Sequence, residues 1–148
     1  MTIKFTILGS GSSIGVPRID GYFGSCDPKE IKNYRTRCSA VISANDKNIL
    51  IDTSPDLRTQ LIKNKIKNID CVFYTHMHAD QTHGINDLRI FYLKNKKKIP
   101  IYADSLTSKY LSSSKSVSEF IFSLELFFSV CTAEIYGIHL SASTSPQV

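Results

Sequence analysis

Two histidines and an aspartate at alternate positions are the residues of this chain best suited to chemistry. They are His76, His78 and Asp80, in the stretch that reads THMHADQTHG. Alternate residues of an extended or tightly turned backbone project to the same side, so both imidazoles could reach one cation. Asp80 could bind a second cation or orient the nucleophile. The spacing therefore predicts a divalent metal site, with Asp80 as the candidate catalytic residue.

The segment just before these residues predicts where the site lies. Residues 69–74 read IDCVFY, a short apolar run typical of a buried strand. The histidines and the aspartate would then occupy the loop at the carboxyl end of that strand. Layered α/β folds commonly carry their active sites in such loops.

The motif resembles the H-x-H-x-D-H signature of the metallo-β-lactamase-fold hydrolases, with one departure. Gln81 stands where that family has its last histidine, and a neutral amide is a weak ligand for a transition metal. His83 lies two residues further on, and we consider it a replacement ligand. The resemblance implies a divalent metal cofactor, zinc in the first place and manganese in the second.

The first half of the chain continues the resemblance. Residues 3–8 predict a strand that runs into the turn GSGSS, and residues 38–43 and 47–52 predict a hairpin joined by Ala-Asn-Asp. Asp52 resembles the structural aspartate of the family, which orients the metal loop by hydrogen bonds. We therefore expect Asp52 to orient the metal ligands through hydrogen bonds rather than to bind the metal itself.

Two helices and a further strand complete the predicted elements. The Ser-Pro-Asp sequence at residues 54–56 combines an N-cap, a proline at the first helical position and an acid in the first turn, so it predicts a helix to about Ile66. A second helix is expected over residues 85–93 and a strand over residues 99–103. The order predicts an α+β fold, the N-terminal half of a metallo-β-lactamase-type αββα sandwich that is incomplete.

The motifs GSSIGVPR, DTSPDLR and HADQTHGINDLR together resemble a phosphodiesterase branch of this superfamily. Its members include cyclic-phosphate phosphodiesterases and tRNA 3′-processing endonucleases. The resemblance implies hydrolysis of a phosphodiester by a metal-bound hydroxide, with a phosphate-containing small molecule or an RNA end as substrate. A net charge of +5 suits such a substrate, and Arg18 and Arg89 are candidates for binding its phosphate.

The character of the chain changes near residue 111. Serine supplies 12 of the last 44 residues but 7 of the first 104, and the last 44 hold only two of the 18 lysines and arginines. We therefore divide the chain into a metallo-β-lactamase-like half-domain, residues 1–111, and a divergent serine-rich and apolar tail, residues 112–148. The tail is either a natural variant that packs through its apolar run, or the product of a frameshift or early stop that replaced the family's second half. We favour the second explanation, because the tail loses the consistency between levels that folding sequences show.

Three functions remain open. The first is an active metal-dependent phosphodiesterase that uses one ion or completes its site in a homodimer. The second is a catalytically inactive, truncated remnant, because the resemblance places further metal ligands in the second half of the sandwich. The third is a basic module that binds RNA or nucleotides, for which the lysine cluster at residues 94–98 is the candidate surface.

Cysteine usage and hydropathy predict the compartment. Cys26 and Cys38 lie twelve residues apart without a C-x-x-C pair, so we expect structural or free thiols rather than a disulfide or zinc site. Cys71 and Cys131 are expected in the core. The sequence shows no secretion signal, and the apolar run near Phe120 is too short to span a bilayer. We expect a cytoplasmic protein that does not contact a membrane.

Overall fold

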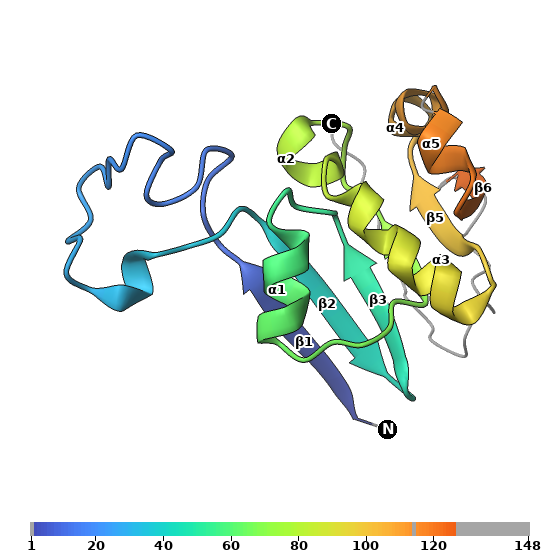
Figure 1. Cartoon of the computed structure of the whole chain (residues 1–148), viewed down its shortest axis with the longest axis horizontal. Helices are drawn as coiled ribbons and strands as arrows, with labels where there is room; N and C mark the ends of the chain where they lie inside the picture. Colours follow the sequence, from blue (N-terminus) through green and yellow to red (C-terminus); the bar gives the residue numbers. More distant parts are fainter. Residues whose placement is uncertain (1, 114, 127–148) are drawn as a thin grey trace, which may run out of the picture.

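A six-stranded mixed sheet forms the centre of the molecule (Figure 1). The computed structural model describes residues 2–113 and 115–126. Its strands follow the chain in spatial order, with antiparallel pairing from β1 to β3 and parallel pairing from β3 to β6. The strands are β1 (Ile3–Gly9), β2 (Ser39–Ala44), β3 (Lys47–Ile51), β4 (Cys71–Phe73), β5 (Ile99–Ala103) and β6 (Ile121–Leu126).

Helices connect the parallel strands β3 to β6, and the antiparallel strands β1 to β3 complete a mixed sheet, which confirms the predicted α+β class. In Figure 1, α1 and α3 lie over the same face of the sheet. No helix in the described part of the chain is long and apolar enough to cross a bilayer. The α-helices are α1 (Leu57–Lys63), α2 (Ala79–Thr82), α3 (Arg89–Asn95), α4 (Ser105–Ser112) and α5 (Lys115–Ser118), and the 3₁₀ helices are η1 (Ile31–Asn33) and η2 (Ile85–Leu88).

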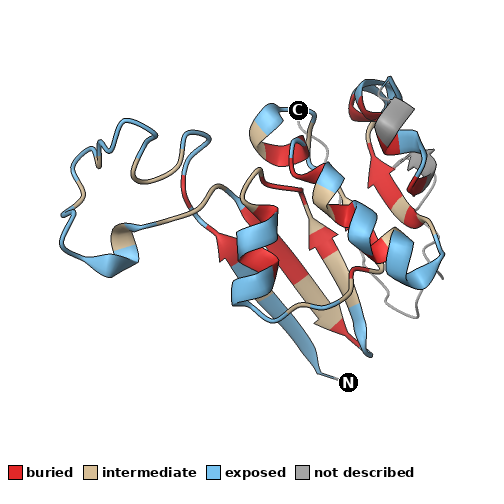
Figure 2. Cartoon of the chain, viewed as in Figure 1, coloured by how far each residue is buried: buried red, intermediate tan, exposed pale blue. Residues whose placement is uncertain are grey.

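The core lies between the sheet and its helices. Val41, Leu50, Val72 and Ile101 pair in register across four neighbouring strands, and each is fully buried. Leu57 of α1 belongs to the same buried cluster. Figure 2 shows this buried band along the inner strands. Apolar residues at a period of two thus attach the helices to one face of the sheet.

The outer strand β1 carries apolar side chains on its other face as well. Ile3, Phe5 and Ile7 are 56%, 59% and 65% exposed. They pair with Ala44, Ile42 and Ala40 of β2, so they share the face opposite to the helices. Apolar side chains on both faces are typical of a sheet that is covered on both sides.

The hairpin turn between β2 and β3 agrees with its prediction. Asn45 and Asp46 have φ values of 47° and 60°, both in the left-handed region. A two-residue turn of this kind matches the twist of the strands, and asparagine and aspartate tolerate it better than other residues with a side chain. The turn sets the register that brings Ala44 opposite Lys47.

The predicted helix boundaries were wrong by a few residues. The regular part of α1 begins at Leu57, although the Oγ atom of Ser54 does accept the N–H of Asp56 at 3.1 Å. The helix ends at Lys63 rather than near Ile66, because Lys65 takes a left-handed φ of 56°. The second predicted helix is a 3₁₀ turn followed by α3, which continues to Asn95.

The first part of the serine-rich tail packs against the same core. Strand β6 pairs in parallel with β5, and Val117 and Phe120 are buried with the residues under the helices. The division of the chain at residue 111 stays a prediction. Cys131, His139 and the rest of residues 127–148 lie outside the described residues.

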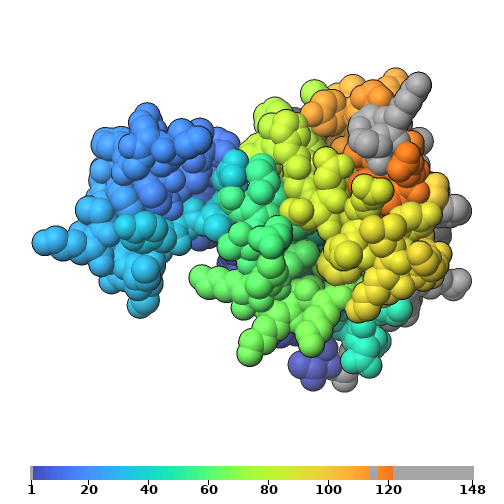
Figure 3. All heavy atoms as spheres, viewed as in Figure 1, coloured from blue at the N-terminus to red at the C-terminus, as the bar shows by residue number. Residues whose placement is uncertain are grey.

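Residues 10–38, which we call the arm, stand off from the sheet. The arm runs from the end of β1 to the start of β2 and forms a separate lobe on the molecular surface (Figures 1 and 3). Backbone hydrogen bonds tie its two sides together, including Arg35 N–H to Val16 O at 2.7 Å and Gly11 N–H to Thr36 O at 2.8 Å. The two sides of the arm are therefore held together by backbone hydrogen bonds, so the arm is a closed loop.

Candidate metal centre

The structure brings together the two histidines and the aspartate that the motif predicts. One ligand atom from each of His76, His78 and Asp80 lies within 4.8 Å of the other two. The imidazoles follow β4, and His78 caps α2 in an extended conformation, so that Asp80 falls in the first helical turn. The three side chains meet because only five residues separate the end of β4 at Phe73 from the start of α2 at Ala79.

Asp52 holds the backbone from which the first histidine projects. Its Oδ1 accepts the N–H of Thr75 and its Oδ2 accepts the Thr75 hydroxyl, both at 2.8 Å. Asp52 is buried and has a left-handed φ of 59°, which turns its side chain from the end of β3 towards the neighbouring loop. Burial raises the pKa of Asp52, and the two hydrogen bonds from Thr75 oppose that rise.

The hydrogen bonds of Thr75 determine which nitrogen of His76 can bind a metal. Because the Thr75 hydroxyl donates its proton to Asp52, its oxygen accepts from Nδ1–H of His76, 2.9 Å away. The Nε2 atom then carries the free lone pair. A hydrogen bond from the second ring nitrogen of a metal-ligating histidine fixes its tautomer and orientation, and here a hydroxyl held by a buried carboxylate accepts that bond.

Asp80 is held from its own helix by Gln81. The Nε2 atom of Gln81 donates to Oδ2 of Asp80 at 3.0 Å, and Oδ1 makes no hydrogen bond to a described residue. Gln81 is buried, its backbone carbonyl accepts the Thr53 N–H at 2.6 Å, and its Oε1 has no hydrogen-bond partner among the described residues. The Gln81 amide, at the position where this chain differs from the family signature, thus orients the Asp80 carboxylate, while its own Oε1 is a buried acceptor without a partner among the described residues.

A glycine allows the metal loop to pack closely on the turn after β3. The N–H of Gly84 donates to the Thr53 carbonyl at 2.9 Å. A Cβ atom at Gly84 would lie 2.0 Å from the carbonyl oxygen of Ser54, so no other residue fits without moving the backbone. Glycine is required here for close approach rather than for an unusual φ.

The structure does not bring His83 to this group. Its Nε2 lies 3.1 Å from the hydroxyl of Tyr110, and it lines a separate cavity of about 400 Å³ with Thr82 and Leu111. The two arginines proposed for substrate lie on other elements than the three ligands. Arg18 pairs with Asp20 in the arm, and Arg89 is exposed at the start of α3.

Arg37, a basic residue near the metal centre, forms a pairing with Asp56 that sequence reasoning missed. Asp56 accepts hydrogen bonds from its backbone N–H at 2.9 Å, its Nε at 2.9 Å and its Nη2 at 2.7 Å. These bonds raise the pKa of Arg37, to which the charge of Asp80 also contributes, and they lower the pKa of Asp56. The dipeptide Arg37-Cys38 and the acid at 56 gave no local sign of this pairing, because the two partners lie 19 residues apart.

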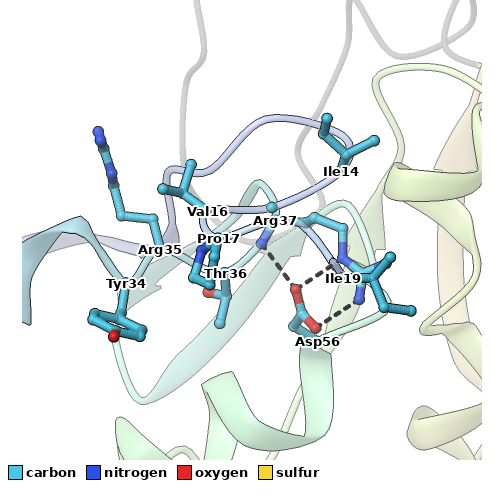
Figure 4. Close-up of a pocket in the computed structure, with 10 residues that line it drawn as sticks. Ile14, Val16, Pro17, Ile19, Tyr34, Arg35, Thr36, Arg37 and Asp56 are labelled. Carbon is cyan, nitrogen blue, oxygen red and sulfur yellow. Dashed lines mark hydrogen bonds and ion pairs between the residues drawn. The ribbon is translucent and has the colours of Figure 1, made fainter. Parts of the chain in front are cut away.

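A second missed feature is a cavity beside Arg37. It is an open cavity of about 400 Å³ lined by residues 14–17, Ile19, residues 34–37 and Asp56 (Figure 4). Most of its wall is apolar, and the Arg37–Asp56 pair forms its charged side. The cavity therefore lies between the arm and the start of α1.

The described cysteines are reduced. Cys26, Cys38 and Cys71 are free thiols, and the Sγ atom of Cys26 accepts a hydrogen bond from Nη2 of Arg35 at 3.3 Å. Cys71 is buried in β4, which confirms its expected place in the core, and burial raises its pKa to about 12.

The donor set fits a divalent transition metal. Two neutral imidazoles and one carboxylate are the ligands of catalytic zinc sites, which keep a further position open. The fixed tautomer of His76 and the free Oδ1 of Asp80 provide donor atoms with available lone pairs. The residues present therefore fit one zinc-like ion.

Comparison with known families gives a match over most of the chain. Residues 47–146 match the model described as a beta-lactamase superfamily domain. This match begins at β3 and includes the metal loop. It also runs into the serine-rich tail.

Three solved structures share the fold. A diphosphatase of the PhnP family superposes with a TM-score of 0.72 and 32% identity, covering 84% of this chain and 51% of that one. Zn²⁺-bound PqqB from Methylobacterium extorquens gives 0.64 and 18% (85% and 49% covered), and the human short-form tRNase Z gives 0.55 and 24% (84% and 45%). The chain spans about half the length of these relatives.

A curated protein gives a more local match. Over 88 residues the chain is 40% identical to an octanoyltransferase of Porphyromonas gingivalis. The match covers 59% of this chain but only 18% of that protein. It therefore concerns a small part of a much longer polypeptide.

Proposed function

This chain belongs to the β-lactamase superfamily, and from that premise we propose that it is a metal-dependent hydrolase of phosphate esters, similar to the phosphodiesterases. The observation that carries the proposal is the convergence of His76, His78 and Asp80 within 4.8 Å, with His76 held through Thr75 by a buried carboxylate. The 32% identity to a diphosphatase over 84% of the chain supports a phosphorylated substrate.

Each residue of the proposed site has a separate task. His76, His78 and Asp80 hold the ion, zinc in preference to manganese because two of the three donors are imidazoles. Asp52 and Thr75 fix His76 in the tautomer that presents Nε2. A bound divalent ion supplies Lewis acidity, which polarises a phosphoryl oxygen and lowers the pKa of water.

Asp80 is also proposed to orient the attacking water. Gln81 occupies Oδ2, so Oδ1 would bind the ion with one lone pair and accept a hydrogen bond from the water with the other. Arg37, whose pKa the nearby Asp80 helps to raise, adds positive charge on the side of the cavity, which favours an anionic substrate. No membrane contact enters this proposal, and a cytoplasmic site of action and a homodimer stay predictions.

Metal binding without catalysis is the second candidate function. Gln81 favours this function. It occupies the position at which the H-x-H-x-D-H signature has a further histidine ligand, and its amide donates a hydrogen bond to Asp80 instead. A chain of this kind would bind one ion and turn over no ester.

Zinc titration followed by a hydrolysis assay tests the proposal. Calorimetry of the purified chain should show zinc binding that the His76→Ala/His78→Ala double variant loses. His83→Ala is the matched control, because His83 bonds Tyr110 outside the group, and it should bind zinc like the unmodified chain. Absence of binding in the unmodified chain would overturn the metal site.

The catalytic claim needs a second readout. The zinc-loaded chain should hydrolyse bis(p-nitrophenyl) phosphate or a diphosphate, and chelation should abolish that activity. Zinc binding with no hydrolysis of either substrate would support metal binding without catalysis instead.

A further inference from the structure

We propose that the cavity beside Arg37 binds a ring-bearing organic group of a phosphate ester whose phosphate lies at the Arg37 side. This inference rests on the proposed function for the reaction, but the binding site stands on its own geometry. The cavity encloses about 400 Å³, within the range of small-molecule sites. It is lined by side chains of the arm and of the turn before α1 (Figure 4).

The walls of the cavity are formed before any ligand binds. Val16 and Arg35 exchange two backbone hydrogen bonds, of 3.1 and 2.7 Å, which close the arm across the cavity. Gly15 takes a left-handed φ of 78°, which turns the chain into this pairing. The three hydrogen bonds from Arg37 to Asp56 attach the arm to the start of α1. A preformed wall reduces the entropy lost on binding.

The apolar lining is open to a ligand. Ile14 and Tyr34 are 62% and 54% exposed, and Ile19 is fully exposed. Figure 4 shows Ile14 and Ile19 on the side of Arg37 and Tyr34 towards the other end. Exposed apolar side chains gathered around a hollow favour an apolar or aromatic occupant over a sugar or glycerol, whose hydroxyls they cannot satisfy.

Arg37 supplies the charged end. Its guanidinium has five N–H donors, and Asp56 takes the Nε and Nη2 positions, so Nη1 makes no hydrogen bond to a described residue. Its side chain is one-third exposed. Arg35 does not share this task, because its guanidinium points away from the Arg37–Asp56 pair in Figure 4 and contacts Cys26. The free donors of Arg37 therefore suit one phosphate oxygen.

The charged end of the cavity is also linked to the metal centre through the turn at residues 53–56. Asp80 contributes to the raised pKa of Arg37, so the two charges lie within electrostatic reach. The turn that contains Asp56 follows Thr53, whose N–H and hydroxyl both contact the Gln81 carbonyl. A phosphate at the ligand group would thus place its organic substituent towards Ile14 and Ile19.

Binding of four phosphates tests the inference without requiring turnover. The probes are 1-naphthyl phosphate, adenosine monophosphate, glycerol 2-phosphate and inorganic phosphate, titrated into metal-free and zinc-loaded chain. We expect 1-naphthyl phosphate to bind about tenfold more tightly than glycerol 2-phosphate in both forms, because only the ring buries apolar surface. Adenosine monophosphate distinguishes a nucleoside pocket from one for simple aryl groups.

Two matched variants locate the effect. Ile14→Ser/Ile19→Ser should reduce the preference to about twofold, because it removes the apolar wall. Ile31→Ser/Ile62→Ser changes two isoleucines of comparable exposure, 75% and 63%, outside the cavity, and should keep the tenfold preference. Equal affinity for naphthyl and glycerol phosphates, or an equal loss in both double variants, would overturn the inference. Loss of zinc binding with the preference intact would overturn only the proposed reaction.

Discussion

The metal loop, residues 75–84, and the arm are both anchored to the turn at residues 52–56, but in different ways. The metal loop is fixed from beneath by Asp52, a buried carboxylate that binds Thr75 through two hydrogen bonds. The arm is fixed from the side by Asp56, a half-buried carboxylate that pairs with Arg37. One short turn therefore supports the candidate ligands at one end and the candidate substrate cavity at the other.

The pKa shifts of the two aspartates record this difference. Burial raises the pKa of Asp52, whereas the hydrogen bonds from Arg37 lower the pKa of Asp56. A buried carboxylate without a cation stabilises geometry at an electrostatic cost, which a metal ion bound nearby would offset. A paired carboxylate stabilises the fold itself. We infer that the first anchor serves the site and the second serves the structure.

Gly84→Ala should have the largest effect of these substitutions, a loss of stability through the contact between the metal loop and the turn. The added Cβ would meet the Ser54 carbonyl at 2.0 Å, so the loop must move off the turn, and we expect about 3 kcal/mol of lost stability. Urea unfolding measures the change. Gly21→Ala is the control: nothing lies within 4 Å of its added carbon, and only a φ of 81° opposes it, at about 1 kcal/mol. Equal costs would show that the loop is not closely packed.

Asp52→Asn should separate support of the site from support of the fold. The amide cannot accept both hydrogen bonds from Thr75 as a carboxylate does, so His76 loses its orientation and zinc affinity should fall roughly 10- to 100-fold. Calorimetric titration measures the affinity. Asp70→Asn removes a carboxylate paired with Lys47 away from the loop and should leave zinc affinity unchanged.

Asp56→Asn should have the opposite profile, with lower stability and nearly unchanged zinc affinity. Loss of the charged hydrogen bonds should cost about 1 to 2 kcal/mol at neutral pH. The pKa of Asp56 is lowered in the folded chain, so its contribution is complete above the ordinary value of 3.8 and is lost as the pH falls through the lower folded value.

The acid dependence provides the check on this assignment. Stability of the unmodified chain should decline more steeply below pH 3.8 than that of the Asp56→Asn variant, as followed by urea unfolding at a series of pH values. Parallel curves would remove Asp56 as the structural anchor of the arm.

Gln81→Met should have the smallest effect of these substitutions, a modest loss of zinc affinity. The substitution removes the hydrogen bond to Asp80, so zinc affinity should fall about threefold, while stability changes little because the unpartnered Oε1 is removed as well. Gln60→Met is the matched control, since Gln60 is also buried with an unpartnered Oε1 but bonds the arm at Thr36 and Arg37. A tenfold or larger loss of zinc affinity in Gln81→Met would indicate that Gln81 itself binds the metal.

The strands and the ligand group could be predicted because their signals are local. The period of two along residues 38–52 fixes which side chains face the helices, and the Asn45-Asp46 turn fixes the register of the hairpin. The alternation of His76 and His78 places both imidazoles together once a strand precedes them. These features depend on neighbours within about ten residues.

The partners of the polar side chains could not be predicted in the same way. Thr75 and Asp52 are separated by 23 residues, and His83 and Tyr110 by 27. The spacing of His83 is compatible with metal binding, yet the helical turn of α2 places it against α4. A residue's position in the sequence does not state which side of a short helix faces a distant strand.

The sequence by itself determined the superfamily, the α+β class and the three candidate ligands, since each depends on residue type, spacing or local periodicity. Only the tertiary structure decided that Asp52 acts through Thr75, that Gln81 holds Asp80 and that Arg37 and Asp56 close a cavity in the arm. The physical reason is that hydrogen bonds and cavities form between segments that packing brings together. Their free energy depends on burial and geometry, which no local pattern records.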